Sequence, residues 1–78
     1  MPAGARLRFV ATAGAAAGAT AATLTGASDR TIRTPLLAAG AGMVIDFVAK
    51  DVTVTPASGF EVHVDTGLGR WQKIAEVA

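Results

Sequence analysis

The sequence predicts a small, mainly β protein: an antiparallel sandwich or a partly open barrel of six to seven short strands. Apolar and polar residues alternate with period two over residues 43–65, which is the pattern of half-buried strands. The predicted strands follow one another at spacings of about 8–12 residues and are separated by Gly, Pro and Asp, as they are in small sandwiches and barrels. Residues 1–27 instead contain 11 alanines and no acidic residue, so this Ala/Gly-rich segment forms either an arm or the first strands.

The first predicted strand covers residues 6–11. Leu7 and Phe9 fall on one face of this strand, and Arg6 and Arg8 fall on the other. This alternation predicts one buried face and one face in contact with water. The two arginines either remain solvated or pair with acidic residues of a neighbouring subunit.

Small residues and threonines dominate the next part of the chain. Residues 14–19 are rich in Gly and Ala and form either a loop or a frayed helical turn. The threonine-rich residues 20–25 predict a second strand, and residues 26–29 predict a turn. Residues 30–34 resume an extended pattern, which Pro35 confines to a sheet edge or a strand end.

The central segment contains the clearest strand of the sequence. Residues 36–39 (Leu-Leu-Ala-Ala) predict a short buried run, and residues 40–42 predict a flexible break. The strand over residues 43–50 has one apolar face and a second face that is half apolar, because it carries Val44 and Val48. A strand with two partly apolar faces contacts either two layers or a partner chain.

The C-terminal third of the chain predicts three further elements. Residues 52–55 form a short strand that Pro56 ends. Residues 60–65 show the cleanest alternation of the chain, with apolar side chains on one face and polar side chains on the other. Residues 66–69 predict a hairpin loop, because two glycines there can adopt positive φ.

Residues 70–77 allow two interpretations. A returning strand would place Trp71, Ala75 and Val77 on one face, whereas a short helix would group Trp71 with Ile74 and Ala75. The preceding hairpin loop favours the strand. Trp71 is the only tryptophan of the chain, and it either anchors the core or occupies a pocket between subunits, where tryptophan is enriched.

The size and composition of the chain predict that it depends on neighbours. We expect one domain over residues 1–78, with 1–27 as the arm or first strands and 28–78 as the main β unit. Leu, Ile, Val and Phe number only 19 of 78 residues, and 18 residues are alanine, so the core is thin. The chain has no cysteine and a single histidine, so no disulfide or structural zinc supports it. Oligomerisation or docking onto a larger body is therefore the remaining source of stability. We expect the isolated chain to be marginally stable.

The charges are unevenly distributed along the chain. Residues 1–35 carry four arginines and one aspartate, a net +3, whereas residues 36–78 carry three basic and five acidic residues, a net −2. These charges are either simply solvated or arranged so that the basic side of one subunit meets the acidic side of the next. Four dispersed arginines and no tyrosine do not make a nucleic-acid surface, so we expect no nucleic-acid partner.

The uncharged stretch between Arg8 and Asp29 is long enough to span a bilayer, at 20 residues. It consists mostly of Ala, Gly, Thr and Ser, which do not favour lipid strongly. We therefore expect no membrane association. A secretory signal is an alternative that would leave a mature chain starting near Ala22, but the apolar region of this signal would be weak.

One cluster of residues could carry chemistry. Glu61, His63 and Asp65 project from one strand face with Cβ atoms about 6–7 Å apart. They form either a metal or acid/base site or an ordinary solvated strand face. Neither an activated nucleophile nor a phosphate-binding loop is present. We expect no enzyme activity, no cofactor, no bound metal and no small-molecule substrate.

The composition and strand pattern resemble those of structural proteins of tailed bacteriophages, above all capsid decoration (cement) proteins. The segments that carry this resemblance are residues 13–24, 43–50 and 60–75 with the turn at 66–69. No specific motif supports it, so no functional residue is transferred. The resemblance implies a non-enzymatic protein bound in many copies to a capsid, often as trimers. Its partners would be other copies of itself and a major capsid or other virion protein, and its location the virion, after assembly in the host cytoplasm.

The sequence therefore leads to one functional hypothesis and two alternatives. The hypothesis is a structural subunit of a larger assembly, most specifically a capsid decoration protein. One alternative is a phage tail or baseplate component, and the other is a small secreted or soluble ligand-binding β-domain that uses Glu61, His63 and Asp65. For the structural subunit we expect an interface that includes Arg6, Arg8, Phe9, Val44, Val48 and Trp71.

Overall fold

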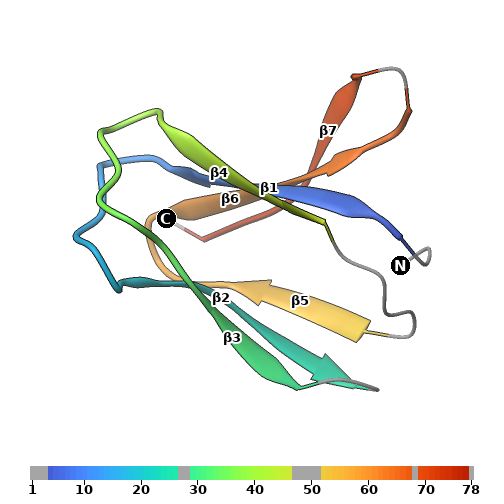
Figure 1. The fold of residues 1–78 in the computed structure, drawn as a ribbon, viewed down its shortest axis with the longest axis horizontal. Helices are drawn as coiled ribbons and strands as arrows, with labels where there is room; N and C mark the ends of the chain where they lie inside the picture. The colour runs from blue at the N-terminus through green and yellow to red at the C-terminus, as the bar shows by residue number, and fades with distance from the viewer. Residues whose placement is uncertain (1–3, 27–28, 47–51, 68, 78) are drawn as a thin grey trace.

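The computed structural model describes residues 4–26, 29–46, 52–67 and 69–77. Within these residues the protein is mainly β and contains seven strands and no helix. The strands form two antiparallel sheets that face each other (Figure 1). The prediction of a mainly β fold with six to seven short strands, either a sandwich or a partly open barrel, is confirmed: the strands form two antiparallel sheets that do not close into a barrel.

Each sheet has a strand from the alanine-rich N-terminal segment at an inner position. The larger sheet, with strand order β4-β1-β6-β7, contains β1 (Arg6–Ala11), β4 (Gly42–Asp46), β6 (Phe60–Asp65) and β7 (Trp71–Val77). The smaller sheet, with order β3-β2-β5, contains β2 (Thr20–Gly26), β3 (Arg30–Arg33) and β5 (Val52–Pro56). Residues 47–51 lie outside the described residues, so the predicted strand over 43–50 is described only as far as Asp46.

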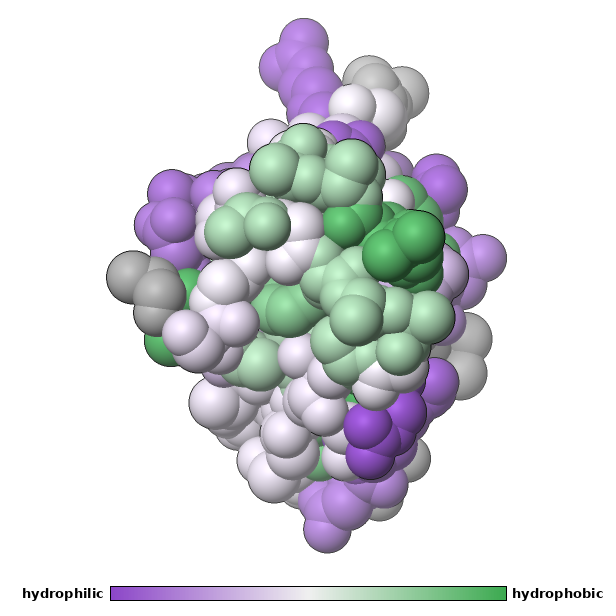
Figure 2. Space-filling view, turned by 90° about the vertical axis from the view of Figure 1, so that its left-hand side faces the viewer, coloured by the Kyte–Doolittle hydropathy of each residue, from purple (hydrophilic) through white to green (hydrophobic). Residues whose placement is uncertain are grey.

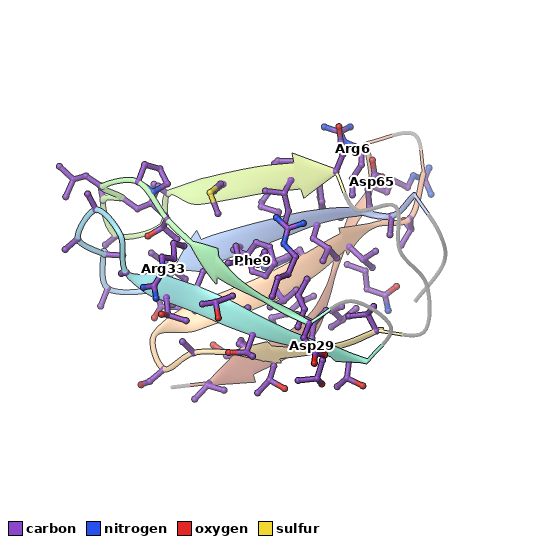
Figure 3. The ribbon with its side chains drawn as sticks, turned by 60° about the horizontal axis from the view of Figure 1, so that its bottom comes forward. Arg6, Phe9, Asp29, Arg33 and Asp65 are labelled. Carbon is purple, nitrogen blue, oxygen red and sulfur yellow. The ribbon has the colours of Figure 1, made fainter. Side chains whose placement is uncertain are left out.

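The alternation in β1 produces the two faces of the larger sheet. Leu7 and Phe9 are completely buried, whereas Arg6 and Arg8 point to the opposite side. Phe9 lies opposite Met43 on β4 and opposite Val62 on β6, and Figure 3 shows it between the two sheets. The structure thus corrects the expectation that Phe9 contributes to an interface, because this side of β1 faces the second sheet.

The core lies between the sheets and is built mainly from β1, β2 and β6. Its largest completely buried side chains are Phe9, Leu7, Leu24 and Val62. Ala11, Ala21 and Ala22 are also buried in this core, and they contribute little apolar area. The partly buried hydrophobic residues that pack against this core are Ala15, Leu37, Met43, Ile45, Val54, Ala57, Val64 and Ala75.

The outer side of the smaller sheet carries exposed threonines on all three strands. Thr23 of β2 lies opposite Thr31 of β3 and opposite Thr55 of β5, and Thr25 lies opposite Thr53. A β-branched side chain suits the pleated backbone, and its hydroxyl group can face water. This explains why the threonine-rich segment forms a strand with one buried and one solvent-exposed side.

The C-terminal segment forms a strand, as its hairpin context predicts. The hairpin loop is also confirmed: Gly67 and Gly69 have φ angles of 104° and 74°, and Thr66 N donates to the Arg70 carbonyl at 2.7 Å. These φ values belong to the left-handed region, which glycine occupies at little cost.

A β-bulge in β7 changes the face on which Trp71 lies. Ala75 pairs with Val62, but the next pair joins Lys73 to His63, so the register shifts and Ile74 becomes an extra residue. A bulge of one residue moves the side chains beyond it to the opposite face. The expectation that Trp71 shares a face with Ala75 and Val77 is therefore wrong, and Trp71 lies on the outer side of the sheet.

Candidate functional site

The candidate site has two parts, of which the first is the outer side of the larger sheet, here called the outer face. Arg6 of β1 lies opposite Asp46 of β4, and Asp65 of β6 lies opposite Trp71 of β7. In the next row, Arg8 lies opposite both Val44 and His63, and His63 lies opposite Lys73. The outer face comprises Arg6, Arg8, Val10, Val44, Asp46, Glu61, His63, Asp65, Trp71, Lys73 and Glu76.

Arg6 joins three strands of the outer face through ion pairs. Its Nε lies 3.1 Å from Oδ1 of Asp46, and its Nη1 lies 3.7 Å from Oδ2 of Asp65. Asp46 is 77% exposed, whereas Asp65 is only 13% exposed. Figure 3 shows Arg6 and Asp65 together at one end of the sandwich. The Asp65 carboxylate also accepts a hydrogen bond from Gly67 N at 2.8 Å, so it links the sheet to the hairpin loop.

Replacing Arg6 by glutamine is expected to lower the free energy of unfolding by less than about 1 kcal/mol, because the Arg6 side chain is 54% exposed and an exposed cation gains little from an ion pair, while Asp65 keeps its hydrogen bond from Gly67 N. The difference from wild type should shrink further at high salt, where exposed charges are screened. Urea denaturation at low and high salt measures both effects. A loss well above this value, unchanged by salt, would show that Arg6 has a structural role beyond these ion pairs.

Trp71 is partly buried beneath two arginines. Cζ of Arg8 lies 4.1 Å from the centre of the Trp71 ring, and Cζ of Arg6 lies 5.9 Å from it. At the shorter distance a guanidinium lies against the ring face and is attracted by the negative charge of the π system. Arg8 and Trp71 come from strands on either side of β6, so the arginine side chain crosses that strand to reach the ring.

Glu61, His63 and Asp65 do not converge on one site. Nε2 of His63 lies 3.0 Å from Oε1 of Glu61, whereas Asp65 is engaged by Arg6 and Gly67. Within the described residues, no cluster of three His, Cys, Asp or Glu side chains could hold a metal ion, and this part of the chain contains no pocket. The arrangement supplies a His–Glu pair on an open surface.

Two carboxylates face each other across β6 and β7, and each has a basic partner. Glu61 lies directly opposite Glu76, and such a pair of like charges is unfavourable by itself. His63 contacts Glu61, and Nζ of Lys73 donates to Oε1 of Glu76 at 3.1 Å. The hydrogen bond and charge of Glu76, with a smaller contribution from Glu61, raise the pKa of Lys73. These contacts compensate the charges of this row within the chain.

The second part of the candidate site is one end of the sandwich, here called the apolar end. It is formed by two loops, residues 12–19 and 34–41, which contain no charged residue. A β-bridge joins the loops, in which Ala15 and Leu37 exchange two backbone hydrogen bonds of 2.8 Å. Gly40 N donates to the Ala11 carbonyl at 2.8 Å, which fixes the second loop to β1.

Apolar side chains gather on the surface of this end (Figure 2). Leu36 is 77% exposed, the largest exposed fraction among the large hydrophobic residues described. The expectation that residues 36–39 form a buried run is therefore wrong: only Leu37 is partly buried, and its neighbours are exposed. The other exposed alanine and proline residues of the two loops are Ala13, Ala16, Ala17, Pro35, Ala38 and Ala39.

The structure separates the residues that the sequence predicted for an interface. Arg6, Arg8, Val44 and Trp71 lie together on the outer face, with Val44 42% exposed. Val48 lies outside the described residues. The sequence reasoning missed Leu36, because two adjacent leucines in the charge-free segment 34–45 predict burial and nothing local shows which of them stays exposed.

Comparisons with known proteins add no family to this description. Among the described residues, no helix has the length and apolar character needed to cross a membrane. Searches against protein-family models, curated proteins and solved structures return no match for this chain.

Proposed function

We propose that this protein is a non-enzymatic structural subunit of a larger assembly and that it acts through contacts between subunits. The most specific form of the proposal is a decoration protein of a tailed-bacteriophage capsid, bound to other copies of itself and to a major capsid or other virion protein. The observation that carries the proposal is the apolar end, where Leu36 is 77% exposed within two uncharged loops.

The energetics of the apolar end favour a partner. Covering a leucine side chain completely stabilises a complex by roughly 1.5–3 kcal/mol. Contiguous apolar patches on soluble proteins often mark contact sites. The two loops are hydrogen-bonded to each other and to β1, so little backbone freedom is lost when a partner binds. The patch therefore combines exposed apolar area with a backbone that is already ordered.

The phage form of the proposal rests on the composition and strand pattern of the chain. Glycine and alanine, which are frequent in the two loops of the apolar end, let two backbones approach closely at a contact. The support for this form is the resemblance in composition between this cysteine-free chain of 78 residues and capsid decoration proteins. The competing ligand-binding function has less support, because Asp65 is held by Arg6 and stays apart from the His63–Glu61 pair.

Replacing Leu36 by serine is expected to weaken association by about ten- to hundredfold, the equivalent of losing a buried leucine side chain. Analytical ultracentrifugation over a range of protein concentrations measures self-association. Density-gradient sedimentation of phage particles assembled with each variant measures binding to the particle. Both experiments compare wild type with the variant under conditions in which the two proteins are equally folded.

The matched control is Ile74→Ser, which removes an apolar side chain that is 46% exposed on the bulge of β7, outside the apolar end. This variant should associate as wild type does. A wild-type chain that stays monomeric at all concentrations and is absent from particles contradicts the proposal. Equal association by wild type and Leu36→Ser contradicts the assignment of the contact to the apolar end.

A further inference from the structure

Arg8 differs from the other described cations of the outer face in having no acidic partner. Arg6 pairs with Asp46 and Asp65, and Lys73 pairs with Glu76. His63 contacts Glu61. Within the described residues, no carboxylate lies within ion-pair distance of Arg8. The acidic groups described on this face are therefore engaged elsewhere, and Arg8 has no ion-pair partner among them.

The stacking on Trp71 orients the Arg8 guanidinium for binding. Its Cζ lies 4.1 Å from the ring centre, so one flat face of the guanidinium is covered by the indole ring. The N–H donors of a guanidinium lie in its plane and point away from its edges, so stacking leaves them available. A carboxylate can accept two parallel hydrogen bonds from such an edge. The indole thus holds the donor fork in place before any ligand arrives.

The surroundings of Arg8 favour a protein segment over a free anion. Val44 lies directly opposite Arg8 on β4 and is 42% exposed, and Val10 is the next residue along β1 on the same face. Arg8 itself is partly buried, as is Trp71. An arginine and a tryptophan with apolar neighbours are the side chains that most often dominate the affinity of protein interfaces. A carboxylate with apolar neighbours of its own would match both the charge of Arg8 and the apolar side chains of Val44 and Val10 beside it.

We propose that the Arg8–Trp71 pair is the anchor for an acidic segment of the partner protein, whose Asp or Glu carboxylate binds the edge of the Arg8 guanidinium while adjacent apolar side chains cover Val44. This inference rests on the proposed function, since it names the chemistry of the partner in the assembly. It concerns a surface separate from the apolar end. The chain would then have two contact surfaces, one apolar and one that selects an acidic segment.

The single tryptophan makes this anchor directly measurable. The probe is the acetylated and amidated peptide Ala-Leu-Glu-Leu-Ala, titrated into the full-length protein while the fluorescence of Trp71 is recorded. We expect a saturable change that weakens as salt is raised, because the contact is charged. The same peptide with Gln in place of Glu should bind at least about tenfold more weakly, as the loss of a charge-assisted bidentate contact implies.

Variants at Arg8 separate recognition from simple cation binding. Arg8→Gln should abolish the response to the Glu peptide, and Arg8→Lys should weaken it several-fold because lysine lacks the planar fork. Arg33→Gln is the matched control, since Arg33 lies in the smaller sheet and donates to the Gly18 carbonyl. It should leave the titration unchanged. Circular dichroism of each variant establishes that the fold is retained.

Several outcomes would overturn this inference. Equal responses to the Glu and Gln peptides would show that the carboxylate is not recognised. A saturable response to inorganic phosphate but not to the Glu peptide would assign the site to a free anion. No response to the peptide, combined with Leu36-dependent association, would refute the acidic anchor and leave the proposed function standing. A peptide response in a protein that never associates would support the acidic anchor and contradict the proposed function.

Discussion

Replacing Phe9 by alanine is expected to leave the protein largely unfolded at 25 °C. Phe9 is completely buried between the sheets and lies opposite Met43 and Val62. Substituting a buried phenylalanine by alanine costs about 3–5 kcal/mol, from lost burial and the remaining cavity. A single core in a chain of this size supplies roughly 3–5 kcal/mol of stability. The two quantities are comparable, so one substitution removes most of the stability.

Chemical denaturation followed by far-ultraviolet circular dichroism measures this loss. Val10→Ala is the matched control, because Val10 is the next residue of β1 and lies on the outer face. We expect it to lower the free energy of unfolding by no more than about 1 kcal/mol, as for a partly exposed position. A Phe9→Ala variant that unfolds cooperatively within about 1 kcal/mol of wild type would mean that the core does not depend on this side chain.

The strands could be predicted from the sequence because their signal is local. In β6, the alternation from Phe60 to Asp65 is enough to indicate which side chains are buried, and burial of Phe60 and Val62 agrees with it. The turn at residues 66–69 is equally local, because two closely spaced glycines permit its backbone angles. Neither feature requires knowledge of which strands pair.

The face occupied by Trp71 could not be predicted in this way. The alternation within residues 71–77 places Trp71 with Ala75, and only the pairing of β7 with β6 reveals the extra residue at Ile74. That pairing is a property of two strands together. Because the bulge moves Trp71 to the outer face, its stacking with Arg8 could not be predicted from the sequence either, although both residues were expected at an interface.

The exposure of Leu36 has a different physical cause. Two adjacent leucines in an uncharged segment indicate burial when the segment is considered alone. The Ala15–Leu37 bridge fixes which of them packs inward, and Leu37 is partly buried as a result. The end of a two-layer sandwich has no third layer to cover it, so Leu36 stays exposed unless another molecule supplies the cover.

Because of the same bridge, we expect Gly14→Ala to destabilise the protein more than Gly18→Ala does. Both glycines have left-handed backbone angles, with φ of 84° and 82°. Alanine at either position is expected to cost roughly 1–2 kcal/mol for this conformation alone. At Gly18 the added Cβ would meet nothing within 4 Å, whereas at Gly14 it would lie 3.2 Å from the carbonyl oxygen of Leu37.

That carbonyl oxygen accepts the 2.8 Å hydrogen bond from Ala15 N, so an alanine at Gly14 strains the link between the two loops of the apolar end. We expect Gly14→Ala to lose at least about 1 kcal/mol more than Gly18→Ala, the scale of one backbone hydrogen bond. Urea denaturation of the two variants gives this difference, and sedimentation shows whether association falls with it. If the two variants prove equally stable, the loops can move apart at no cost. The apolar end would then lack the ordered backbone that makes it a ready contact surface.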